Sequence, residues 1–72
     1  MPRLPILRSR QVLAALERAG FYIVRQRGSH LQLKKGNLLV TVPIHGGDLK
    51  PETLRSILRQ AKMTVQELHK YL

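Results

Sequence analysis

Apolar residues recur with a helical period between Ser9 and Gly20 of this 72-residue chain. Side chains three and four residues apart lie on the same side of an α-helix, so the spacing predicts one buried face. The residues of that face are Val12, Leu13, Leu16 and Ala19. Ser9 is a suitable N-cap residue, and Gly20 suits the position just after a helix, where φ is often positive. The pattern therefore predicts a helix that is capped by Ser9 at its start and ends before Gly20.

The next residues have the composition and alternation of β-strands. We predict strands over residues 21–26, 31–34 and 38–42, with His30 at the start of the second, between the turn and Leu31. Gly28-Ser29 and Lys35-Gly36-Asn37 supply the turn residues between them, and Pro43 ends the third strand. Such short connections predict antiparallel hairpins, so the three strands should form a meander.

The last third of the chain returns to a helical pattern. Pro51 fits the first position of a helix whose apolar face is Leu54, Ile57, Leu58 and Ala61. A break near residues 62–63 and the capping-box spacing of Thr64 and Glu67 predict a short final helix over residues 65–72. Residues 1–8, with Pro2 and Pro5, read as an extended arm whose apolar side chains dock on the body. We predict a single domain over residues 1–72, an α+β two-layer sandwich with element order α-β-β-β-α-α and helices on one face of the sheet.

The charge of the chain indicates a polyanionic partner. Thirteen Lys and Arg face four Asp and Glu, a formal net charge of +9. Such an excess of one sign favours nucleic acid over a membrane as the partner, although an acidic protein would serve the same electrostatics. The chain has no cysteine, which excludes disulfides and thiolate metal sites, and its acids lie far apart in sequence, unlike those of a two-metal nuclease. With no apolar segment of membrane-spanning length and no signal-peptide pattern, a cytoplasmic location is expected.

His30 is the first candidate for chemistry. Alternation places Leu31 and Leu33 on one face of the strand and His30, Gln32 and Lys34 on the other, with Arg25 and Arg27 expected nearby. Nearby cations disfavour the imidazolium, so a neutral ring could accept a proton from a ribose 2′-hydroxyl. The hydroxyl would attack the adjacent phosphate, leaving a 2′,3′-cyclic phosphate and a 5′-hydroxyl without a metal ion or other cofactor. A surface histidine without function fits the spacing equally well.

Other residues have a structural and a functional interpretation. The main role of Gly28 and Ser29 is to form the turn, although their backbone amides could also bind a phosphate oxygen. His45 is better explained by hydrogen bonds within its loop than as a second acid–base group, and His69 is interpreted as structural. A basic stripe on the second long helix could be a solvated surface or an RNA contact. The stripe comprises Arg55, Arg59 and Lys62.

Several segments together resemble the HicA toxin family. They are Gly20-Phe21, Arg27-Gly28-Ser29-His30, Val42-Pro43-Ile44-His45-Gly46 and residues 50–61, with the opening residues 1–5 also in keeping. The resemblance covers nearly the whole chain and implies a fold like the double-stranded-RNA-binding domain. It also implies a type II toxin that cleaves mRNA without metal and arrests translation, with His30 of the Gly-Ser-His motif as the active histidine. The implied partner is a HicB-type antitoxin that covers the active face, so the toxin should be a monomer when free and part of a hetero-oligomer with the antitoxin.

Three hypotheses follow from the sequence. The first is a ribonuclease toxin that uses His30. The second is a module that binds double-stranded RNA without cutting it, and the third is a basic adaptor for an acidic protein. The first is favoured, because a module that only binds RNA has no need of a histidine at position 30.

Overall fold

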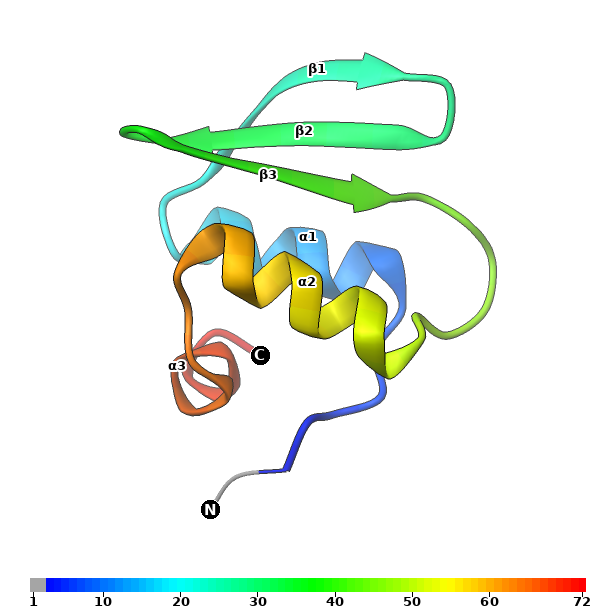
Figure 1. Ribbon diagram of the computed structural model, residues 1–72, viewed down its shortest axis with the longest axis vertical. Helices are drawn as coiled ribbons and strands as arrows, with labels where there is room; N and C mark the ends of the chain where they lie inside the picture. The colour runs from blue at the N-terminus through cyan, green and yellow to red at the C-terminus, as the bar shows by residue number, and fades with distance from the viewer. Residues whose placement is uncertain (1–2) are drawn as a thin grey trace.

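The computed structural model describes residues 3–72, and its elements follow the predicted order (Figure 1). The helices are α1 (Ser9–Arg18), α2 (Pro51–Ala61) and α3 (Val65–Lys70), and the strands are β1 (Tyr22–Arg27), β2 (His30–Lys35) and β3 (Leu38–Pro43). The strands form one antiparallel sheet in the order β1-β2-β3, with α1 and α2 packed on one of its faces. The predicted α+β two-layer arrangement, like that of a double-stranded-RNA-binding domain, is confirmed.

The hydrophobic core lies between β2, β3 and the two long helices. Each of these elements places a row of apolar side chains on one face, in the periodicity that the sequence predicts. Full burial of one such side chain stabilises the fold by about 1.5–3 kcal/mol. The largest fully buried side chains are Val12, Leu16, Leu33, Val40, Val42, Leu54, Ile57 and Leu68. By contrast, β1 has no buried residue, because the helices cover the sheet from the β3 side and leave β1 as an open edge.

The prediction that Ser9 caps α1 is wrong. Arg8 is the N-cap residue, and its backbone N–H donates to the Gln11 side chain at 2.8 Å. Ser9 is the first helical residue and is only 4% exposed. Its hydroxyl donates to the Pro43 carbonyl oxygen at 2.7 Å, so the side chain links α1 to the end of β3 instead of capping its own helix.

The end of α1 is held by a residue of the sheet. Gly20 follows the C-cap residue with φ +105°, as the sequence predicts. The Lys35 ammonium donates to the Ala19 carbonyl oxygen at 2.6 Å and lies 5.8 Å from the centre of the Phe21 ring. A cation at this end of a helix is favoured by the helix dipole.

The predicted start of α2 and the break after it are confirmed. Pro51 is the first residue of α2, and Lys62 adopts the left-handed conformation that ends the helix, with φ 52°. Thr64 and Glu67 form the predicted capping box at α3, which ends at Lys70, two residues earlier than predicted. No helix in residues 3–72 is long and apolar enough to cross a membrane.

The N-terminal arm docks in part. Leu7 is buried and Leu4 packs against the core, whereas Ile6 is 76% exposed. Leu49 N–H donates to the Leu7 carbonyl oxygen at 2.8 Å, which ties the arm to the loop before α2. Pro2, also assigned to the arm, lies outside the described residues.

Candidate functional site

His30 is the first residue of β2 and is exposed to solvent. In the sheet it lies directly opposite Arg27 of β1 and Pro43 of β3. Cross-strand partners share a face of the sheet, with Cβ atoms about 4.5–5.5 Å apart. The two neighbours of His30 across the sheet are thus an arginine on one side and the end of β3 on the other.

The side chains that share this face point away from the helices. Leu33 is fully buried on the core side, so His30, Gln32 and Lys34 occupy the opposite side by alternation. Register adds Arg25 and Arg27 from β1 and Thr41 from β3, together with the exposed apolar side chains of Tyr22 and Leu39 opposite Lys34. We call this surface the open face. Its polar residues are Arg25, Arg27, His30, Gln32, Lys34 and Thr41.

A β-bulge at Val24 gives both arginines their direction. Ile23 pairs with Leu33, and the next pair is Arg25 with Gln32, so Val24 is an extra residue in β1. Without that extra residue, strict alternation after Ile23 would turn Arg25 and Arg27 toward the core side. Bulges re-aim side chains in this way. The sequence predicts arginines near His30, but no local pattern indicates the bulge that places them there.

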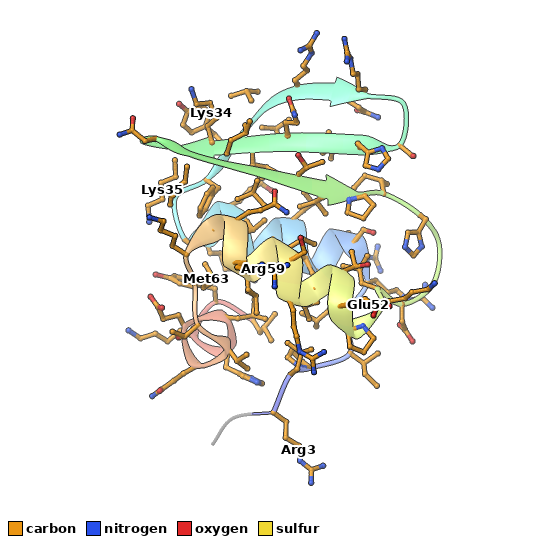
Figure 2. The ribbon with its side chains drawn as sticks, viewed as in Figure 1. Arg3, Lys34, Lys35, Glu52, Arg59 and Met63 are labelled. Atoms are coloured by element: carbon orange, nitrogen blue, oxygen red, sulfur yellow. The ribbon has the colours of Figure 1, made fainter. Side chains whose placement is uncertain are left out.

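The predicted cations lie at different distances from His30 along the sheet. Arg27 is in the same row, whereas Arg25 is opposite Gln32, about 7 Å further along β2. Lys34 is four residues from His30, about 13 Å along the strand. Figure 2 shows Lys34 at the end of the sheet away from the β1–β2 turn. A single phosphate beside His30 is therefore within reach of Arg27 but not of Lys34.

The turn before His30 is fixed on two sides. Gly28 has φ +55° at the first position of a two-residue turn, as in type II′ hairpins. Ser29 does not have positive φ, and its carbonyl oxygen accepts from Ile44 N–H at 2.6 Å. This hydrogen bond joins the turn to the loop after β3. The backbone that carries His30 is thus held by both neighbouring strands and by this loop.

The loop after β3 brings His45 to the same end of the sheet. The His45 ring Nδ1 lies 2.7 Å from the Gly46 carbonyl oxygen, and its backbone N–H lies 3.5 Å from the Ser9 hydroxyl. Because a carbonyl oxygen only accepts, Nδ1 must carry the proton. His45 is exposed, so its Nε2 remains available to solvent or to a ligand.

The structure does not bring the α2 stripe to the open face. Arg55 and Arg59 are exposed on α2, Lys62 is exposed directly after its last residue, and α2 packs against the opposite face of the sheet. Figure 2 shows Arg59 on the surface of α2 in the helix layer. His69 is also remote from His30: its Nε2 donates to the Arg3 carbonyl oxygen at 2.9 Å and links α3 to the N-terminal arm. In residues 3–72 no three His, Cys, Asp or Glu side chains form a group that could hold a metal ion.

Comparison with known families agrees with the resemblance seen in the sequence. Residues 9–63 match the model of the HicA toxin of bacterial toxin–antitoxin systems. This segment contains every residue of the open face, the His45 loop and all of α2. A search of curated proteins finds no match. Because the match covers well over half of the chain, the protein belongs to the HicA toxin family.

Proposed function

We propose that this HicA toxin is a metal-independent endoribonuclease that cleaves mRNA and arrests translation, with His30 as its acid–base group. HicA toxins are mRNA interferases, and this general activity comes to the chain from its family. The observation that carries the specific proposal is the position of His30, which is exposed on the open face directly opposite Arg27.

The reaction begins with proton transfer to a neutral His30 ring. The ring accepts the proton of a ribose 2′-hydroxyl, and the 2′ oxygen attacks the adjacent phosphorus. The bond from phosphorus to the 5′ oxygen breaks, and this oxygen takes up a proton from solvent water and leaves as a hydroxyl. The products are a 2′,3′-cyclic phosphate and a 5′-hydroxyl end. The Arg27 guanidinium, in the same row, stabilises the charge that develops on the phosphate oxygens.

Other basic residues act on RNA away from the cleaved bond. Arg25 and Lys34 lie further along the open face, where they would contact neighbouring phosphates of a strand laid on the sheet. The turn of Gly28 and Ser29 borders the reacting phosphate. Arg55, Arg59 and Lys62 would meet only RNA that continues round to the helix layer.

The proposed protein partner is a HicB-type antitoxin, since HicA toxins pair with HicB antitoxins. The net charge of +9 favours an acidic partner. Next to the two arginines, β1 exposes apolar side chains that a partner could bury: Tyr22 is 56%, Ile23 47% and Val24 45% exposed. An antitoxin bound over β1 and the open face would cover His30.

Replacement of His30 tests the enzymatic role. His30→Ala should abolish RNA cleavage and growth arrest, while circular dichroism and binding of an uncleavable RNA remain close to those of the wild type. His69→Ala is the matched control, because His69 is also exposed but lies in α3. Loss of activity in both variants, or in neither, would contradict the role of His30.

Two companion measurements test the chemistry. A 2′-deoxy substitution at the cleaved nucleotide should block the reaction, because the attacking hydroxyl is then missing. Addition of a chelator should leave the rate unchanged, and a chelator-sensitive rate would contradict the metal-independent reaction. If the wild type binds duplex RNA and cuts none, the binding-module hypothesis replaces the enzyme.

A further inference from the structure

A pocket of 320 Å³ lies at the end of the sheet that carries His30, between the first turn of α1 and the loop after β3. It is lined by Arg8, Ser9, Arg10, Ile44, His45, Gly46 and Gly47. None of these residues is on the open face. The pocket therefore brings together a second group of basic side chains, separate from Arg25 and Arg27.

The chemistry of the lining suits an anion with several oxygens. Arg8, Arg10 and His45 supply cationic or hydrogen-bonding groups, and all three are exposed. Arginine is the side chain best matched to phosphate, because its planar group can donate two parallel hydrogen bonds. The Nδ1 proton of His45 is used in the hydrogen bond to the Gly46 carbonyl oxygen, so Nε2 can donate to a phosphate only when both ring nitrogens are protonated. Asp48 is not among the lining residues, but it forms an isolated antiparallel β-bridge with Arg8, so its carboxylate lies on the same side as the Arg8 side chain and offsets part of that positive charge.

Hydrogen bonds fix the pocket relative to His30. The hydroxyl of Ser9, which is buried at the edge of the pocket, donates to the Pro43 carbonyl oxygen at 2.7 Å. Ile44 N–H donates to the Ser29 carbonyl oxygen at 2.6 Å. Pro43 is the cross-strand partner of His30. The Cα atoms of His30 and His45 are thus at most about 13 Å apart, since one cross-strand step and two chain steps join them.

The fold does not require a glycine at position 46. Gly46 is not among the glycines with positive φ, and a Cβ placed on it would meet no atom within 4 Å. A side chain there would be accommodated without strain and would extend from the pocket lining. Position 46 thus offers a way to change the pocket without disturbing the core.

We propose that this pocket binds a phosphate of the RNA substrate other than the one that His30 attacks. The RNA strand then runs from the open face round the end of the sheet, with one phosphate beside His30 and Arg27 and another beside Arg8, Arg10 and His45. This inference rests on the proposed function for its substrate. It adds an anchor that orients the strand relative to His30.

A charge placed in the pocket tests the proposal. The probe is a short single-stranded 2′-O-methyl RNA, which has no free 2′-hydroxyl and cannot be cut by the proposed reaction. Relative to Gly46→Gln, Gly46→Glu should weaken binding by about tenfold at low salt, because the carboxylate repels the bound phosphate. Asn37→Glu and Asn37→Gln form the matched pair, because Asn37 lies in the β2–β3 turn at the other end of the sheet. That pair should differ by less than about threefold.

A neutral methylphosphonate linkage, moved along the RNA one position at a time, identifies the phosphate. At one linkage, the methylphosphonate should weaken binding to Gly46→Gln but should not weaken binding to Gly46→Glu. The same linkage should have no effect on binding to Arg10→Gln.

Equal affinities of the two Gly46 variants for the unmodified RNA would contradict the proposal that the pocket binds a phosphate. The absence of any linkage whose effect differs between these variants would also contradict it. These experiments measure binding and not cleavage. A failure of the proposed function would be detected separately, because the wild type would then leave natural RNA intact.

Discussion

Arg27 lies directly opposite His30, at the first pair of the β1–β2 hairpin. The two-residue turn of Gly28 and Ser29 separates them in the chain and fixes this pairing. An imidazole ring and a guanidinium therefore share one row on the open face. The pairing depends on the backbone of the hairpin and is present before RNA binds.

Replacement of Arg27 should affect the chemical step. We expect Arg27→Gln to lower kcat for RNA cleavage by about 10- to 100-fold, because it removes a donor from the phosphate at which negative charge develops. Arg25→Gln is the control, one row further along the sheet, and should lower kcat by less than about fivefold. Single-turnover cleavage measures both. Equal losses in the two variants would mean that charge alone, and not the position opposite His30, decides the rate.

The salt dependence of RNA binding should distinguish the two basic surfaces. For single-stranded RNA, each phosphate contact that is lost lowers the slope of log K against log salt by about 0.7. Arg25→Gln with Arg27→Gln should therefore lower the slope by about 1.4, whereas Arg55→Gln with Arg59→Gln should leave it nearly unchanged. Both double variants remove two charges, so net charge is matched. A larger change from the α2 pair would place the RNA on the helix layer.

Much of the fold could be predicted from local sequence, because local residues determine it. Pro51, the Thr64–Glu67 capping box and the two glycine turns each act within a few residues, and the periodicity of apolar side chains defines the core. Ser9 shows the limit of such reasoning. Its type suits an N-cap, but its hydroxyl bonds to Pro43, 34 residues away, and no local pattern indicates that contact.

The candidate site, too, could be predicted from the sequence only in part. His30 at the start of a strand, with leucines on the opposite face, followed from alternation. The direction of Arg25 and Arg27 did not, because a bulge depends on how β1 pairs with β2, and one extra residue leaves no mark in the sequence. The separation of the α2 stripe from the open face depends likewise on packing between distant elements.

Deletion of Val24 tests the bulge directly. Because Val24 is the unpaired residue, its removal should close the bulge and leave every other pairing of β1 with β2 in place, including Arg27 with His30. We expect the variant to fold with a melting temperature within about 5 °C of the wild type and to retain RNA cleavage. Deletion of Gln26 is the control, because it would turn Arg25 toward the core side opposite Leu31. Because Gln26 is itself exposed at that position, this variant should also fold, but it should lower the slope of log K against log salt for RNA binding by about 0.7, whereas deletion of Val24 should leave the slope unchanged. The reverse order would contradict the assigned bulge.

Acid should weaken the C-terminal helix through Glu67. The backbone N–H and the side chain of Thr64, with a smaller effect of Lys70, lower the pKa of Glu67 from its usual value of 4.5. The unfolded chain therefore binds this proton first as the pH falls. The contribution of Glu67 to stability is present above about pH 4.5 and is lost as the pH falls through the lowered pKa of the folded state.

Glu67→Gln isolates this contribution, because glutamine can still accept the hydrogen bond from Thr64 N–H but carries no charge. Urea unfolding of both proteins, measured from neutral to strongly acidic pH, should show a wild type that is more stable at pH 7. The difference in the free energy of unfolding should shrink to zero at the acidic end, where Glu67 is protonated in both the folded and the unfolded chain. A difference that stays constant across the range would mean that the capping box acts through its hydrogen bonds alone, independently of the charge on Glu67.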